Sequence, residues 1–156
     1  MPANDPILAL DHDHVELSKL VSELDGLIAR ARAGEAAAVH EDVAALLEGL
    51  REDLFLHFAQ EEEGLFPYLG ARLPDERGAI AAIETAHDAI CGALSRMNHL
   101  ASRGLADHVE PLAALFERFA AGYAAHAREE RAFLRRVGAR LDDAQRAEVT
   151  ELVKGL

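Results

Sequence analysis

Four long segments of this chain repeat apolar residues at alternating intervals of three and four positions. This spacing predicts amphipathic helices, each with one narrow buried face. Four such faces, joined by short breaks, are buried most simply in an all-α, up-down four-helix bundle. The stripes are Leu10, Leu17, Val21, Leu24 and Ile28; Val43, Leu46, Leu50, Leu54 and Leu65; Ile80, Ile83, Ile90, Leu94 and Met97; and Leu112, Phe116, Phe119, Phe133 and Val137.

Helix-breaking residues separate the four segments. The stretch "PYLGARLPDERG" interrupts the chain after the second segment, and glycine marks the other breaks, at Gly34, Gly104 and Gly138. No low-complexity linker divides the 156 residues. We therefore expect residues 1–156 to form a single domain.

Two capping patterns predict where helices begin. Asp142 followed by Gln145 predicts a capping box for a short C-terminal fifth helix that ends near Val153. Asp107 with Glu110 predicts the same arrangement at the start of the fourth long helix.

In each stripe, histidine occupies one position where an apolar residue is expected. Two of the helices then add a glutamate one turn later on the same face. The six inward-facing residues are His14, His57, Glu61, His87, His126 and Glu130. The other four histidines lie off the stripes, and we expect them to be exposed: His12, His40, His99 and His108.

The two inward glutamates need a positive charge nearby. An unpaired carboxylate in a dry core costs several kcal/mol, and no lysine or arginine lies on the stripes at the matching level. A lone histidine on an apolar face is ordinarily a hydrogen-bonded core residue, but four histidines with two carboxylates favour a metal ion. Antiparallel packing is compatible with one common level, nearer one end of the bundle than its centre.

The segments "ALDHDHVEL", "LFLHFAQEEEGLFPYL", "ETAHDAI" and "YAAHAREERAFL" carry these residues. Their combined pattern, H–HxxxE–H–HxxxE, resembles a divergent subgroup of the hemerythrin-like (HHE cation-binding) family over nearly the whole chain. The resemblance implies a non-heme diiron centre, oxo- or hydroxo-bridged, with histidines as terminal ligands and the two carboxylates as bridges. Zinc and manganese remain alternative metals.

The chain departs from the oxygen-carrier pattern of that family at two places. Carriers have HxxxH on the third helix, but here Ile83 and Cys91 stand four residues either side of His87. Carriers also end with HxxxxD, whereas Arg131 stands five residues after His126. These differences argue against reversible oxygen carriage.

Two six-coordinate irons offer about twelve positions, of which the four histidines and two bridging carboxylates fill about eight. Three further residues lie near the stripes and are weaker candidates for an additional ligand: Glu84, Tyr123 and Cys91. An open centre of this kind favours binding of, or reaction with, O₂, peroxide or NO, and leaves enzyme turnover undecided. Two alternatives stay open: an iron sensor or buffer that needs a separate protein partner, and a zinc-bound interaction module.

Charge and composition limit which partners the protein can have. The formal net charge of −12 disfavours nucleic acid and anionic membrane surfaces as partners. A single cysteine excludes an intramolecular disulfide, no signal peptide is recognisable, and no apolar run approaches the ~18 residues of a membrane span. The sequence thus predicts a cytoplasmic protein, either a monomer or a homodimer.

Overall fold

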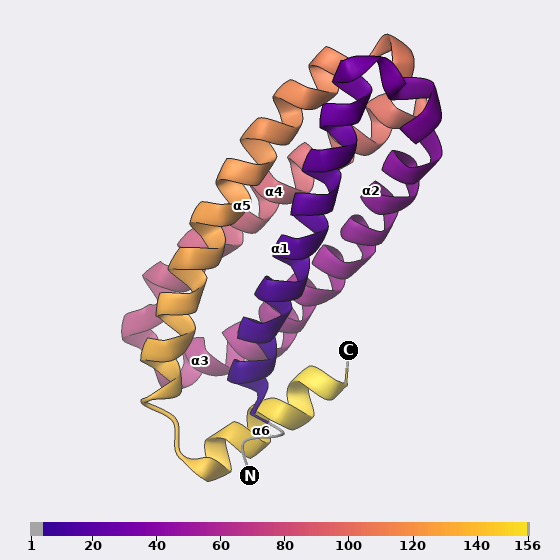
Figure 1. Cartoon of the computed structure of the whole chain (residues 1–156). Helices are drawn as coiled ribbons and strands as arrows, with labels where there is room; N and C mark the ends of the chain where they lie inside the picture. The colour runs from indigo at the N-terminus through magenta and orange to yellow at the C-terminus, as the bar shows by residue number, and fades with distance from the viewer. Residues whose placement is uncertain (1–4, 156) are drawn as a thin grey trace.

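The computed structural model describes residues 5–155, and within them the chain is helical with no β-strand. Four long helices lie side by side as an up-down bundle (Figure 1). Each one packs against two neighbours, so that the helices form a closed ring in the order α1, α2, α4, α5. The long helices are α1 (Pro6–Arg30), α2 (Ala36–Ala59), α4 (Arg77–Ser102) and α5 (Val109–Gly138). The predicted fold class is confirmed.

Shorter elements complete one end of the bundle. There α6 (Asp143–Lys154) lies across the end, near the start of α1 and against the segment η3 (Gln60–Leu65) (Figure 1). The helix α3 (Phe66–Arg72) follows η3, and the 3₁₀ turn η4 (Pro74–Glu76) leads into α4.

The two reversals at the other end of the bundle depend on glycine. Gly34 has φ 101° within the turn η2 (Ala31–Glu35), and Gly104 has φ 106° just before the 3₁₀ turn η5 (Leu105–Asp107). Only glycine adopts this left-handed region without strain. Both predicted breaks are therefore real chain reversals.

The break predicted from "PYLGARLPDERG" is wrong in its position. Helical structure continues from α2 through η3 and α3 as far as Arg72, so the chain turns only at Leu73. Pro67 lies at the start of α3, directly after the π-helical segment η3.

The capping predictions have different outcomes. Asp142 and Gln145 form the predicted reciprocal capping box of α6, with hydrogen bonds of 2.8 and 2.9 Å. The prediction for Asp107 is wrong, because Asp107 lies in η5 and α5 begins only after His108. The ring Nδ1–H of His108 instead donates 2.7 Å to the carbonyl of Gly104.

The apolar interior is divided into two clusters. The larger one fills the bundle between residues such as Leu17, Leu54, Ile90 and Tyr123. The smaller one lies toward α3 and α6, where Leu10, Leu65, Ile83 and Phe133 meet. The stripes predicted this core except at Val21 and Leu46, which are only partly buried, and Leu47 occupies the core position beside Leu46.

Between the two clusters lies a layer of buried polar side chains, which we call the polar layer: His14, His57, Glu61, His87, His126 and Glu130. On α1, for example, His14 stands between Leu10 of the smaller cluster and Leu17 of the larger one. The polar layer is therefore nearer the α6 end of the bundle than its middle, as the sequence indicated. None of the helices formed by residues 5–155 is long and apolar enough to cross a membrane.

Candidate metal centre

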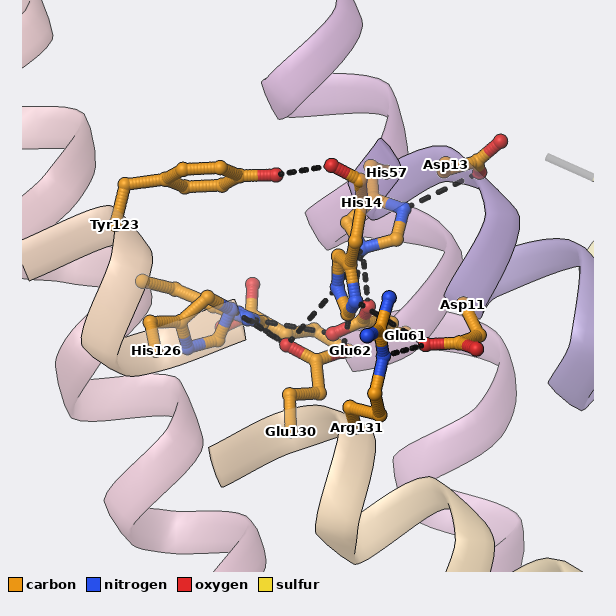
Figure 2. Close-up of polar contacts among 11 residues, drawn as sticks. Asp11, Asp13, His14, His57, Glu61, Glu62, Tyr123, His126, Glu130 and Arg131 are labelled. Carbon is orange, nitrogen blue, oxygen red and sulfur yellow. Dashed lines mark hydrogen bonds and ion pairs between the residues drawn. The ribbon is translucent and has the colours of Figure 1, made fainter. Parts of the chain in front are cut away.

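One histidine from each long helix points into the polar layer, and each of these rings is at most 2 % exposed. Figure 2 shows His14, His57 and His126 converging from three different helices. The Nε2 atoms of His14 and His57 are 3.1 Å apart, and the ring of His87 lies 4.7 Å from that of His126. The rings therefore form two pairs, one from α1 and α2 and the other from α4 and α5.

Glu61 connects the two pairs. Its Oε1 lies 2.5 Å from Nε2 of His57, the residue one turn earlier on the same chain segment. Its other oxygen, Oε2, lies 3.2 Å from Nε2 of His87 on α4. One carboxylate therefore faces a histidine of each pair.

Glu130, on α5, is the second buried carboxylate of the polar layer. Its Oε2 lies 2.5 Å from Nε2 of His126, 3.6 Å from that of His87 and 3.7 Å from that of His14. Its Oε1 lies 3.9 Å from Nε2 of His57. Glu130 is thus within reach of all four imidazoles.

The donor atoms fall into two overlapping groups, each with all its atoms within 4.8 Å of one another. One group combines His14 and His57 with Glu61 and Glu130, and the other combines His87 and His126 with Glu130. Imidazole nitrogens with carboxylate oxygens suit Fe, Mn and Zn.

Glu61 lies in η3, where the chain is wound as a π-helix rather than an α-helix. Such wide turns are often found at functional sites because they reorient one side chain inside a helix. A small residue also holds this turn against α6: a Cβ added to Gly64 would stand 3.2 Å from Cγ2 of Val153. Local winding and the packing of α6 thus fix the direction of Glu61.

Carboxylates outside the polar layer orient two of the imidazoles. Asp13 Oδ2 lies 3.3 Å from Nδ1 of His57, and Glu62 Oε1 lies 3.4 Å from Nδ1 of His87. Asp11 is more distant, 4.0 Å from Nδ1 of His14. A carboxylate that accepts the Nδ1 proton leaves the Nε2 lone pair free for a metal.

The helical stripes do not identify these orienting residues and give no role to Asp13. Each stands beside a residue of the polar layer in sequence but contacts the histidine of a neighbouring helix. The only sequence signal for these residues is their position beside a polar-layer residue, Asp13 in "DHDH" and Glu62 in "EEE". Which histidine it contacts depends on the packing of the helices.

Aromatic rings close the α4 side of the polar layer. Phe58 stacks on His87 with ring centroids 3.7 Å apart and an interplanar angle of 13°. Phe66 lies roughly parallel to the same ring at 6.1 Å, and the edge of Phe58 also meets His126. This packing keeps water away from the pair formed by His87 and His126.

Of the three weaker ligand candidates, Glu84 and Cys91 lie outside both groups of donor atoms. Glu84 is partly buried on α4, one turn before His87. The hydroxyl of buried Tyr123 points to the main-chain carbonyl of His14 at 3.5 Å, and burial raises the pKa of this phenol (Figure 2). Cys91 is partly buried, and burial raises the pKa of its thiol to about 11, so it is protonated at neutral pH.

The four histidines off the stripes stay outside the polar layer. His12 and His99 are exposed, as expected. His40 and His108 are partly buried instead.

Both carboxylates of the polar layer are fully buried, and they share the charge unequally. Burial, reinforced by the neighbouring Glu130, raises the pKa of Glu61 well above its usual range. Burial acts in the same direction on Glu130, but contacts with Glu61 and the surrounding imidazoles outweigh it and hold the pKa of Glu130 well below its usual range. Burial likewise opposes protonation of His87, yet contacts with Glu130 and Glu61 raise its pKa to about 9.

The polar layer fits a bound cation. The oxygens of Glu61 and Glu130 and the Nε2 atoms of His87 and His126 are buried without a well-aligned hydrogen bond among the described residues. Arg131, next to Glu130 in the chain, pairs with Asp11 at 2.8 Å outside the polar layer (Figure 2). Buried polar atoms without partners are costly, and a metal ion would satisfy them together.

Fold and site together define a helical-bundle protein with a buried histidine–carboxylate centre of the cation-binding kind. A family model described as the hemerythrin HHE cation binding domain matches residues 5–153. The chain therefore belongs to the hemerythrin HHE cation-binding domain family, as its four histidine segments indicated. Comparison with curated proteins and with solved structures gave no significant match.

Proposed function

We propose that this protein is a non-heme diiron protein that binds or reacts with O₂, peroxide or NO. In this proposal His14 and His57 hold one iron, His87 and His126 hold the other, and Glu61 and Glu130 bridge them. The bound irons would supply reversible one-electron chemistry and positions where a small ligand can bind. The physiological partner in this proposal is a small molecule. The proposed location is the cytoplasm, because a single partly buried thiol suits a reducing compartment.

The observation that carries the proposal is the position of Glu61 between the two histidine pairs, 2.5 Å from one and 3.2 Å from the other. A carboxylate that binds a single metal ion would not require a second histidine beside its other oxygen, as is found for Glu61. Two ions sharing two carboxylates account for all four imidazoles and for both buried acids.

The protein side chains then have distinct roles. Asp13 and Glu62 hold the Nδ1 protons of His57 and His87, so that both rings present Nε2 to the centre. Phe58 and Phe66 exclude water on the α4 side. With about four of twelve coordination positions free, the proposal favours ligand exchange over guarded oxygen storage.

Metal analysis with spectroscopy tests this function. Protein purified from iron-supplied cells should contain about two irons per chain and absorb strongly in the near ultraviolet in air, and reduction should remove that absorption. Zinc as the only stoichiometric metal would instead support an interaction module. Manganese as the stoichiometric metal would support the same metal site with a different redox chemistry.

Turnover separates a redox protein from an iron sensor or buffer. Peroxide added to the iron-loaded protein should be consumed catalytically, and the Glu61→Gln variant should lose most of that activity. Stoichiometric oxidation without further consumption would favour the sensor or buffer, which needs a separate protein to read its state.

A further inference from the structure

The surface of the bundle is hollowed between α1 and α5. A groove of about 870 Å³ runs there, and His14 is one of the residues that line it. Small side chains leave it open: Ser18 and Ser22 on α1, and Ala124 and Ala127 on α5. His14 is 2 % exposed, and its Nδ1 is buried without a hydrogen-bond partner among the described residues. The groove thus brings solvent next to His14, the α1 histidine of the polar layer.

This groove is cationic on an otherwise acidic chain. Three cations line it, Lys19, Arg128 and Arg131, against one carboxylate, Glu23, whereas the whole chain carries −12. Lys19 and Arg131 are each paired with an acid at its margin. No ion pair is found for exposed Arg128 within residues 5–155, so its charge faces the groove unneutralised.

Neither of two other grooves beside the bundle has both properties. A groove of about 260 Å³ between α1 and α2 reaches His57, but Asp13, Glu16 and Asp53 line it, and this charge repels anions. A groove of about 220 Å³ between α4 and α5 carries Arg96 and Arg118 but contains no residue of the polar layer.

We propose that the α1–α5 groove is the route and outer binding site through which small monovalent anions reach the metal centre on its His14 and His57 side. Azide, nitrite and hydroperoxide belong to this chemical class. The inference rests on the proposed function, because it assigns a ligand class and an entrance to that same centre. The other side is closed by Phe58 stacked on His87.

Charge reversal tests the attraction. Azide association with the iron-loaded protein is followed by stopped-flow absorption, comparing Arg128→Glu with Arg118→Glu. Both are exposed arginines on α5, and both changes alter the net charge equally. Arg128→Glu should slow azide association about three- to tenfold at low salt, with less effect near 0.5 M salt, and should leave association of neutral NO unchanged. Arg118→Glu should behave as the wild type.

Filling the groove tests the route. Ser18→Phe places a ring one turn from His14, and Ala89→Phe in the α4–α5 groove is the matched control, since both positions are exposed. Ser18→Phe should slow association and dissociation of azide and NO by similar factors and leave the azide dissociation constant nearly unchanged. If Ser18→Phe does not fold, Ser22→Phe serves in its place.

A measurement on the metal-free protein tests the groove independently of the proposed diiron function. After chelation, azide titration should shift the backbone amide NMR signals of Ser18, Ser22 and Arg128 in the wild type and in Arg118→Glu, but not in Arg128→Glu. Absence of an iron–azide absorption band in the wild type would count against the proposed function alone. Equal azide association rates in the two charge variants, or no amide shifts along the groove, would overturn the inference.

Discussion

Replacing Glu61 by glutamine should stabilise the metal-free protein and weaken the metal-bound one. Glu61 is fully buried, so in the absence of metal it must be neutral or carry a charge in a dry interior. Glutamine has nearly the same shape and carries no charge. The same carboxylate that costs stability without a metal becomes an anionic ligand when a cation is present.

The size of the effect follows from proton linkage. Because the pKa of Glu61 in the folded, metal-free protein is raised, the folded state keeps a proton that the unfolded state loses above about pH 4.3. Stability is therefore lost as pH rises from that value toward the folded pKa, by about 1.4 kcal/mol per pH unit. At pH 7 the upper bound is about 4 kcal/mol. Glutamine does not titrate, so it avoids this loss.

Urea unfolding after chelation, at about pH 4.5, 6 and 7.5, measures the difference between Glu61→Gln and the wild type. The variant should have the larger free energy of unfolding, by about 1–3 kcal/mol at pH 7.5, and the advantage should shrink at the lowest pH. Added metal should raise the stability of the wild type far more than that of the variant. Glu63→Gln, an exposed neighbour with the same charge change, should have no effect. A metal-free Glu61→Gln that is less stable than the wild type at pH 7.5 would refute this reasoning.

Three further outcomes are expected. His126→Ala should remove most bound metal, measured by elemental analysis, whereas exposed His12→Ala should retain it. Asp13→Asn should weaken metal binding about 10- to 100-fold in chelator competition, with little change in metal-free stability, because Asp13 orients the imidazole from outside the polar layer. Arg136 holds the pKa of nearly buried Glu76 low through two hydrogen bonds of 2.8 Å, which stabilises the fold above the unfolded pKa and is lost as pH falls through the folded one. Arg136→Ala should therefore lower the free energy of unfolding by about 1–3 kcal/mol at pH 7 and by less near pH 3.

Helical phase made much of this architecture predictable. A histidine in an apolar stripe faces the core whatever the neighbouring helices do, and all six residues named on that basis lie in the polar layer. The family resemblance added the bridging role proposed for the two carboxylates, which the stripes alone do not contain.

What the sequence did not reveal depends on neighbouring helices and on local winding. Asp13 belongs to the same helix as His14 but supports His57 across an interface, and no spacing rule within one helix finds such a contact. The π-helical turn that carries Glu61 follows no residue pattern, since "QEEEGL" is equally compatible with an ordinary helix. The spacing predicts Leu46 rather than Leu47 in the core because the two adjacent leucines straddle the edge of the buried face.

The polar layer separates two apolar clusters that would otherwise form one continuous interior. In the metal-free protein the clusters meet across two buried acids, of which Glu61 keeps its proton, and the smaller cluster, with α3 and α6, has fewer residues. A bound cation would fasten the halves into one cooperative unit, so that amide exchange near α6 reports whether the centre is filled. Amide exchange at the surface would thereby report metal occupancy more than one helical turn away from the ion.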